Sequence, residues 1–247
     1  MTADSDTVVR FAGVRKAYRL GETWVQALKG VDLSIARGGF VAVAGPSGSG
    51  KTTLLNLVGC LDVPTEGEVY VHGQATSRLS DAVATRLRRD AIGFIFQSFN
   101  LVPVFDVYEN VEFPLILKGW ARKARDRKVR ETVEAVGLAS HLAHRPDQLS
   151  GRQRQRVAIA RALVTDPLLV LADEPTANLD SETGGGIVRL MRDINRERSV
   201  TFIFATHDAR VVELATRIVR LRDGVVESDQ RGGAPASREA TRLPAAP

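Results

Sequence analysis

The chain has 247 residues, of which 44% are apolar and 26% are charged, as in an ordinary globular protein. This length accommodates one large domain or two small lobes that share a core. The single cysteine, Cys60, excludes an internal disulfide framework. No apolar run approaches the roughly 20 residues that a membrane-spanning helix needs. The net charge of +5 is spread over interleaved acids and bases, so it does not by itself indicate a nucleic-acid partner.

The first third of the chain contains short segments with strand patterns. We expect strands at residues 8–11, 31–35, 40–44 and 68–72. The strand at 40–44 leads through a glycine-rich turn into an apolar helix at 53–58. Residues from about 75 to 145 are expected to be mostly helical, with breaks at 100–103 and at Pro114.

The second half of the chain alternates helix and strand. Residues 168–172 and 200–205 are continuous apolar runs, as in strands that are buried on both faces of a parallel sheet. A hairpin is expected at 217–227, with its turn at Asp223-Gly224. The tail 228–247 is rich in Gly, Ala, Pro, Ser and Arg and is predicted to be disordered. The fold class is therefore α/β, with a parallel-sheet core, an N-terminal antiparallel β subdomain and an inserted α-helical subdomain at about 97–162.

A phosphate-binding loop follows the strand at 40–44. The segment Gly45-Pro46-Ser47-Gly48-Ser49-Gly50-Lys51-Thr52 satisfies the pattern G-x-x-x-x-G-K-[ST] and lies between a strand and a helix. Its glycines let backbone N–H groups close around an anion. The start of the following helix, at Thr53, adds its positive dipole end. Lys51 can bridge the β- and γ-phosphates, and the Thr52 hydroxyl can bind Mg²⁺.

Two acidic residues, Asp173 and Glu174, end the apolar run at 168–172. A carboxylate at the end of a buried strand can hold the shell of a magnesium ion, which is the role predicted for Asp173. The adjacent Glu174 can polarise an attacking water. The chain has no N-K-x-D motif for reading guanine, so the predicted substrate is ATP.

A third motif is more specific. The segment Leu149–Leu163, with the sequence LSGRQRQRVAIARAL, resembles the signature of the ABC transporter ATPases, whose usual core is LSGGQ. Ser150 can cap the start of a helix, and Gln153 can close a capping box with it. This second helix start, with Ser150, Gly151 and Gln153, would present N–H groups and a hydroxyl to an anion. In the family the signature acts on ATP that is bound by the other subunit, so the resemblance implies a homodimer.

The resemblance covers residues 7–227 and assigns further positions. It implies that Tyr18 stacks on adenine, that Gln97 senses magnesium, and that His207 contacts the γ-phosphate. The loop that ends at Asp180 is expected to cross the dimer. The implied catalytic residues are therefore Lys51, Gln97, Glu174 and His207, and the implied metal ligands are Thr52, Gln97 and Asp173.

The segments 58–62, 96–101, 109–114 and 172–180 resemble the branch of the family that serves lipoprotein release and macrolide export. This likeness implies an ATPase that energises a separate membrane permease, from the cytoplasmic face of the membrane. Apolar residues around 97–114, including Phe99, Leu101, Val104, Phe105 and Phe113, could form a groove for a permease helix. Two alternatives stay open, an importer ATPase and a soluble ATPase that acts on DNA or ribosomes. No nucleic-acid partner is expected, because zinc-binding cysteine clusters are absent and there is one cassette.

Arg152, Ala177 and a run of three glycines depart from the family pattern. Arg152 stands where the signature usually has glycine. A cation in the first turn of a helix opposes the dipole by about 0.3–1 kcal/mol, and we expect Arg152 to point aside and leave the site active. The run Gly184-Gly185-Gly186 lies early in a helix, where each glycine costs about 0.8–1 kcal/mol relative to alanine. Close packing or a loosened first turn would explain the run.

Overall fold

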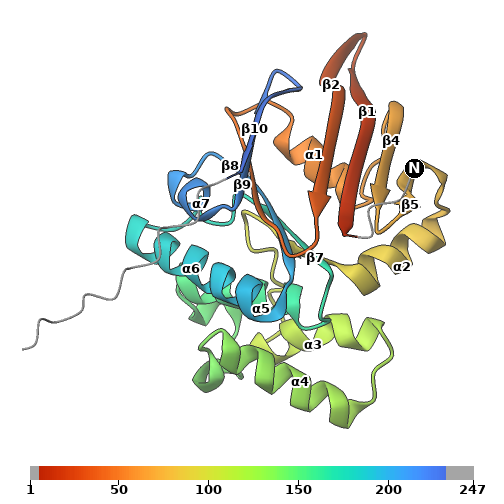
Figure 1. Cartoon of the computed structure of the whole chain (residues 1–247). Coiled ribbons are helices and arrows are strands. Elements are labelled where there is room, and N and C mark those ends of the chain that lie inside the picture. The colour runs from red at the N-terminus through yellow and green to blue at the C-terminus, as the bar shows by residue number, and fades with distance from the viewer. Residues whose placement is uncertain (1–5, 232–247) are drawn as a thin grey trace, which may run out of the picture.

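The computed structural model describes residues 6–231 (Figure 1). A four-stranded antiparallel sheet has the order β2-β1-β4-β5. Its strands are β1 (Thr7–Leu20), β2 (Thr23–Ala36), β4 (Glu66–Val71) and β5 (Gln74–Ala75). The strands β1 and β2 are much longer than the apolar segments expected at 8–11 and 31–35. Near the turn between the two strands the backbones still pair, although most of the side chains there are exposed or only partly buried.

A six-stranded sheet with the order β10-β9-β3-β8-β7-β6 forms the centre of the molecule. Its strands are β3 (Phe40–Ala44), β6 (Ile92–Ile95), β7 (Leu169–Asp173), β8 (Thr201–Thr206), β9 (Arg217–Arg222) and β10 (Val225–Arg231). All neighbouring pairs from β9 to β6 are parallel, and β10 adds to β9 in the antiparallel direction. The predicted fold class, with a parallel core and an antiparallel flank, is confirmed.

The central sheet is buried on both faces. Phe40, Phe202 and Phe204 point into one hydrophobic core, while the alternate residues Val41 and Ile203 point into the other. Alternation of side chains along a strand produces this division. The second core also contains residues of β1, β2 and β4 and of the helix α1 (Lys51–Val58). Figure 1 shows α1 between the two sheets, and it contacts β2 and β4 of one sheet and β7 and β8 of the other.

The other helices are α2 (Asp81–Ala91), α3 (Val107–Leu117), α4 (Arg122–Ala135), α5 (Gly151–Leu163), α6 (Ser181–Arg198) and α7 (Ala209–Leu214), with 3₁₀ turns at Thr76–Arg78, Ala139–His141 and Pro146–Gln148. Helix α2 packs into the second core beside α1, and the helices α3 to α7 contribute to the first core on the opposite face. In Figure 1, α3 and α4 project below the central sheet, and α5 and α6 pack against it. Within residues 6–231, no helix has the length and apolar character that a membrane span requires.

Two details of the expected helical region are wrong. Residues 92–95 form β6, an edge strand of the central sheet. The run is too short and too close to a helix for its pattern to stand out in the sequence. Pro114 does not break a helix but lies inside α3. The helix ends at Leu117, so the hydrogen bond that proline cannot donate is lost only near its last turn.

The expected tail boundary is also wrong, because β10 continues through Arg231 rather than ending at Glu227. The extra residues pair with β9, and Asp229 forms an ion pair with Arg217 at 2.6 Å. Composition does not reveal such backbone pairing. The remainder of the expected tail, 232–247, lies outside the described residues.

The β9–β10 hairpin braces the phosphate-binding loop. The Gly224 amide donates to the Ser49 carbonyl at 3.1 Å, and the Lys29 amide donates to the Gly224 carbonyl at 2.8 Å. A Cβ atom at Gly45 would clash with the backbone carbonyl of Leu221. The loop therefore lies against a hairpin that is distant in sequence, and only glycine fits at this point of contact.

Candidate functional site

The loop between β3 and α1 forms a cradle of backbone groups. Gly50 precedes α1 with φ +102°, and no side chain caps the helix. A Cβ atom there would lie 2.5 Å from the Ala27 carbonyl oxygen, so both the left-handed backbone and the close approach require glycine. Lys51 donates from Nζ to the carbonyls of Gly45 at 2.8 Å and Pro46 at 2.9 Å. The uncapped N–H groups of α1 and this ammonium together suit an anion.

Asp173, the last residue of β7, faces the cradle. Its carboxylate accepts a hydrogen bond from the Thr52 hydroxyl, with oxygen distances of 3.1 and 3.3 Å. Burial raises the pKa of Asp173, and the charge of the adjacent Glu174 adds to this effect against the opposing influence of Thr52 and Lys51. A hydroxyl and a carboxylate in contact are two of the oxygen ligands that Mg²⁺ prefers.

Glu174 follows β7 in a left-handed conformation with φ +44°. Its amide donates to the Ala205 carbonyl at 2.9 Å, which ties the turn to β8. One carboxylate oxygen accepts from the Thr206 hydroxyl at 3.2 Å, and the other lies 2.8 Å from Nδ1 of His207. The Glu174 side chain is 15% exposed and that of His207 is 71% exposed, so an oriented carboxylate sits beneath an accessible imidazole.

These groups line one pocket of about 450 Å³. It lies where the carboxyl ends of β3, β7 and β8 meet, which is the usual ligand position in a parallel sheet. The residues that line it are Val25, Gln26, Ala27, Ser47, Gly48, Gly50, Lys51, Thr52, Thr53, Gln97, Asp173, Glu174 and His207. The pocket thus brings together the predicted phosphate-binding, metal-binding and hydrolytic residues from segments far apart in the chain.

Tyr18 lies beside this pocket and does not line it. It pairs across the hairpin with Val25, a lining residue. Its hydroxyl donates to Asp62 at 2.8 Å, and the Lys16 ammonium lies 4.9 Å from its ring centroid and 2.6 Å from Asp62. Burial raises the pKa of Tyr18. The structure therefore anchors Tyr18 by its polar end, and its contact with adenine stays a prediction.

The start of α5 has the predicted capping box. The Ser150 hydroxyl accepts from the Gln153 amide at 3.3 Å, and the Gln153 side chain accepts from the Ser150 amide at 2.8 Å. Neither residue lines the pocket, and neither does Gly151. Arg152 is exposed, with its guanidinium 3.9 Å from where a Cβ atom of Gly186 would stand. It thus extends toward α6, in agreement with the expectation that it points aside.

Asp180 caps the start of α6 by accepting from the Thr183 amide at 2.9 Å, and it also lies outside the pocket. The loop before it contacts one pocket residue, because the Asn178 side chain donates to the Gln97 carbonyl at 2.8 Å. Four of the predicted site residues, Ser150, Gly151, Gln153 and Asp180, are therefore separated from the other predicted residues within one copy of the chain.

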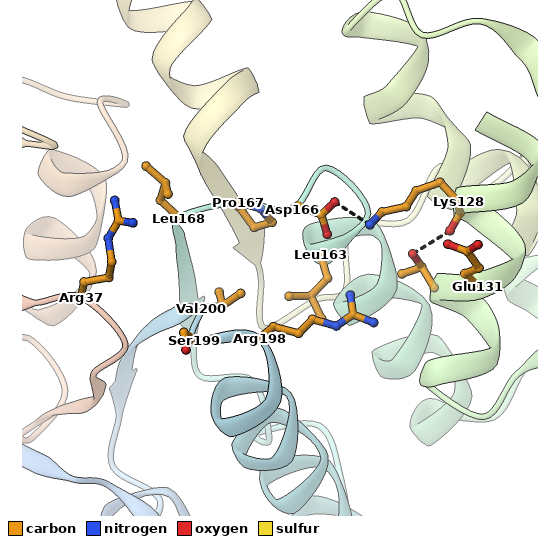
Figure 2. Close-up of a pocket in the computed structure, with 11 residues that line it drawn as sticks. Arg37, Lys128, Glu131, Leu163, Asp166, Pro167, Leu168, Arg198, Ser199 and Val200 are labelled. Carbon is orange, nitrogen blue, oxygen red and sulfur yellow. Dashed lines mark hydrogen bonds and ion pairs between the residues drawn. The ribbon is translucent and has the colours of Figure 1, made fainter. Parts of the chain in front are cut away.

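A second pocket, of about 470 Å³, lies at the opposite ends of the parallel strands (Figure 2). Leu168 and Val200, which precede β7 and β8, form part of its wall. Figure 2 shows the ion pair between Lys128 and Asp166 at its rim, at 2.5 Å. It contains neither the glycine loop nor the Asp173–Glu174 pair, and it is remote from the carboxyl-end site where parallel sheets bind ligands.

A groove between α2, β6 and α3 differs from the predicted apolar surface. Its apolar lining includes Leu61, Phe94, Phe96, Pro114 and Leu117. The predicted Leu101 instead packs against the core, and the ring centroids of Phe105 and Phe113 lie 5.9 Å apart with their planes tilted by 56°. Leu61 follows α1 and Phe94 lies in β6, so both come from outside the predicted 97–114 segment.

Sequence reasoning also missed the residues that hold Glu174 and His207 in place. Thr206 donates to Glu174, and Asp208 accepts hydrogen bonds from Thr176 and Arg210. Burial alone would raise the pKa of Asp208, but these hydrogen bonds lower it to about 2. The position of Asp208 directly after the candidate His207 is the sequence feature that could have identified it.

The donor set fits ATP and a single Mg²⁺ ion. Glycines form the cradle, Lys51 supplies a cation, and the Ser49 hydroxyl is buried there with no partner. Within the described part of the chain, no cluster of three or more His, Cys, Asp or Glu side chains could hold a metal ion. Thr52 and Asp173 suit Mg²⁺, which commonly takes one or two protein oxygens and completes its shell with phosphates and water.

Comparison with known proteins agrees with this geometry. The ABC transporter family matches residues 28–177. The lipoprotein-releasing system ATP-binding protein LolD 1 of Rhodopseudomonas palustris is 45% identical over 89% of this chain and 98% of its own length. The macrolide export ATP-binding/permease protein MacB of Bdellovibrio bacteriovorus is 43% identical over 97% of this chain, which spans only 35% of that relative.

A solved structure is also similar. The ATP-binding cassette MJ0796 of Methanocaldococcus jannaschii, a dimer in a post-hydrolysis state bound to ADP and Pi, has 46% identity and a TM-score of 0.84. The match covers 92% of this chain and 99% of the cassette. With the glycine cradle, the Asp173–Glu174 pair and the capped signature helix in one fold, the chain belongs to the ABC transporter family, as an ATP-binding subunit that hydrolyses ATP.

Proposed function

We propose that the chain binds ATP with Mg²⁺ in the pocket at the carboxyl ends of β3, β7 and β8. The observation that carries this proposal is the gathering of Lys51, Thr52, Asp173, Glu174 and His207 in one pocket of about 450 Å³. The phosphates would lie on the uncapped start of α1, with the Lys51 ammonium turned from its present carbonyl partners toward them. Thr52, Asp173 and Gln97 would hold the magnesium ion, which neutralises charge on the phosphates.

Glu174 is the proposed general base. Its carboxylate is held by Thr206 and His207 and opens into the pocket. There it can accept a proton from a water that attacks the γ-phosphate. His207 is accessible at the rim, and its ring would contact the γ-phosphate while it fixes the orientation of Glu174. Tyr18, anchored on Asp62, would stack on the adenine.

A second copy of the chain completes the site. Ser150, Gly151, Gln153 and Asp180 lie outside the pocket of their own copy, yet the start of α5 has the N–H groups of an anion site. The cassette MJ0796, at 46% identity, is a dimer in its structure with ADP and Pi. A face-to-face homodimer would place each α5 start on the ATP that the other copy holds.

ATP hydrolysis would drive a membrane permease of the macrolide-export or lipoprotein-release type, with this chain at the cytoplasmic face of the membrane. Relatives with these names support the assignment. The Bdellovibrio relative carries ATP-binding and permease functions by name, and this chain spans 35% of it. The groove lined by Leu61, Phe94, Phe96, Pro114 and Leu117 would receive a helix of the permease.

Replacing Glu174 tests the site. Glu174→Gln keeps the shape of the side chain and removes the base, so we expect turnover to fall by a factor of about 10²–10³, while ATP binding stays within about twofold of wild type. The variant should accumulate as a dimer in ATP, measured by size-exclusion chromatography with light scattering. Glu134→Gln, at an exposed position of α4, is the matched control. Wild-type turnover in Glu174→Gln would exclude Glu174 as the base.

Replacing Leu117 tests the permease groove. Leu117 is 55% exposed and lies in the groove, whereas Leu20 is 66% exposed at the end of β1. Leu117→Glu should abolish co-purification with a co-expressed membrane permease, and Leu20→Glu should retain it. Equal retention by both variants would place the permease contact elsewhere. Salt-sensitive retention on DNA or ribosomes, with no membrane partner, would contradict a transport role.

A further inference from the structure

Arg210, in the first turn of α7, joins the segment that follows β7 to the segment that follows β8. Its Nε and Nη2 atoms donate to the carboxylate of Asp208 at distances from 2.6 to 3.0 Å. Its Nη1 atom donates to the backbone carbonyl of Ser181 at 2.6 Å and to that of Asp180 at 3.3 Å. A planar guanidinium can satisfy a carboxylate and two carbonyls at once, which a lysine ammonium cannot do with the same fork geometry.

Asp208 extends this connection toward the hydrolytic residues. It follows His207 directly, and its carboxylate also accepts from the Thr176 hydroxyl at 2.5 Å. Its amide donates to the Thr206 hydroxyl at 3.0 Å, and that hydroxyl in turn donates to Glu174. The loop after β7 and the loop after β8 are therefore joined at several points, with the Asp208–Arg210 pair in the middle.

The glycine run at the start of α6 fits the same contact. Gly184 is buried, and a Cβ atom there would lie 2.5 Å from Nη1 of Arg210. The nearest atom to a Cβ at Gly185 is a side-chain nitrogen of Arg189 at 3.4 Å, which is an ordinary contact. At Gly186 the nearest atom is 3.9 Å away. Only at the first glycine of the run would an added Cβ displace a neighbour, and that neighbour is the movable end of the Arg210 side chain.

We propose that Arg210 is a positioning residue that locks the loop 174–181 to the His207–Asp208 segment, and that Gly184 is the position that admits its guanidinium. The inference rests on the proposed roles of Glu174 and His207. Both residues lie on the locked loops, and so does Asp180, which is expected at the dimer contact. Loss of the lock loosens the hydrolytic geometry and leaves the phosphate cradle around Lys51 untouched. It should therefore lower kcat and leave KM for ATP nearly unchanged.

A double-mutant cycle on the full chain tests the proposal. Arg210→Ala and Gly184→Ala should each lower kcat on the order of tenfold, as expected when a reacting geometry is misplaced, with KM within about twofold of wild type. Because the added methyl acts by displacing the guanidinium, the double variant should be no slower than Arg210→Ala. Arg210→Lys should restore part of the loss, since it keeps the cation beside Asp208. Gly185→Ala is the matched control and should keep wild-type kcat.

Thermal unfolding separates positioning from folding. Alanine is the better helix former, so Gly185→Ala should raise the melting temperature by about 2–4 °C for a chain of this size. Gly184→Ala should remain folded, with a melting temperature within about 2–4 °C of wild type, while still losing activity. Multiplicative losses in the double variant, wild-type kcat in Arg210→Ala, or a KM change as large as the kcat change would each overturn the proposal. If Glu174→Gln also kept wild-type turnover, the proposed active site would be wrong. If Arg210→Ala kept wild-type turnover while Glu174→Gln was inactive, only the proposed role of Arg210 would be wrong.

Discussion

The helices α1 and α5 both begin at a motif that is predicted to bind phosphate, but they differ in how their first-turn N–H groups are capped. At α1 the residue before the helix is Gly50, with φ +102° and no side-chain cap. At α5 it is Ser150, which closes a reciprocal capping box with Gln153. The first helix offers its N–H groups to a ligand, and the second holds its own start in shape.

This difference indicates a division of labour between the two motifs. The start of α1 has no side-chain cap, so we expect the cradle to bind nucleotide within one copy of the chain. The start of α5 is capped without any ligand, because Ser150 and Gln153 form two reciprocal hydrogen bonds. The Ser150 hydroxyl accepts in this box and can still donate its proton. A preformed surface of this kind suits a partner copy that arrives with ATP already bound.

The largest expected effect comes from removing the cation of the α1 cradle. Lys51→Ala should weaken ATP binding by about 1.5–3 kcal/mol, or roughly 10- to 150-fold, because a hydrogen bond to a charged phosphate is lost. The turnover rate should fall by a larger factor than the affinity for ATP. Isothermal titration with ATP at fixed Mg²⁺ measures the binding. An unchanged dissociation constant would mean that α1 is not the primary nucleotide site.

Ser150→Ala is the matched change at α5. It removes the cap, which costs about 1 kcal/mol of stability and should lower the melting temperature by about 2–4 °C. We expect turnover to fall on the order of tenfold and ATP binding by a single copy to stay at the wild-type value. If Ser150→Ala weakened ATP binding as much as Lys51→Ala, the two helix starts would act on the same phosphate within one copy.

Arg152 provides a smaller test of the α5 start. Its guanidinium extends toward Gly186 of α6, and a first-turn cation opposes the dipole by only about 0.3–1 kcal/mol. Arg152→Gly should therefore change turnover by less than about tenfold in a steady-state ATPase assay. A rise of about tenfold or more would show that the natural signature is impaired and that Arg152 reaches the phosphate.

A third helix start, that of α7, gives a prediction about stability at acid pH. Asp208 caps α7 by accepting from the Arg210 amide at 2.9 Å, and its pKa is lowered to about 2 from 3.8. Its contribution to stability is present above pH 3.8 and is lost as the pH falls through about 2. Asp208→Asn should thus be less stable than wild type in urea at pH 7. The difference should shrink below pH 4, and a constant difference down to pH 2 would contradict the shifted pKa.

Much of the fold follows from local patterns in the chain. The buried strands β3, β7 and β8 are short apolar runs whose ends carry the site residues, so both the strands and the chemistry at their ends are visible in the sequence. The capping box of α5 is equally local, since Ser150 and Gln153 are three residues apart. Such features are fixed by neighbours in sequence and can be predicted without tertiary information.

The features that escaped prediction depend on distant contacts. The strand β6 is recognisable only through its pairing with β7, and β10 extends to Arg231 because Asp229 meets Arg217. The glycine at 184 could not be explained from the helix alone, since its neighbour Arg210 belongs to another element. The groove beside α3 likewise draws Leu61 and Phe94 from separate segments. The local sequence of these segments does not indicate which distant residues they contact.

The hairpin β9–β10 also sets an order of events during synthesis. The phosphate-binding loop lies in the first quarter of the chain, yet its backbone rests on Leu221 and Gly224, which are made much later. A nascent chain that has not yet released these residues from the ribosome lacks one wall of the loop. Competence to bind nucleotide should therefore arise abruptly, when the last strands add to the sheet, rather than when the loop itself is translated.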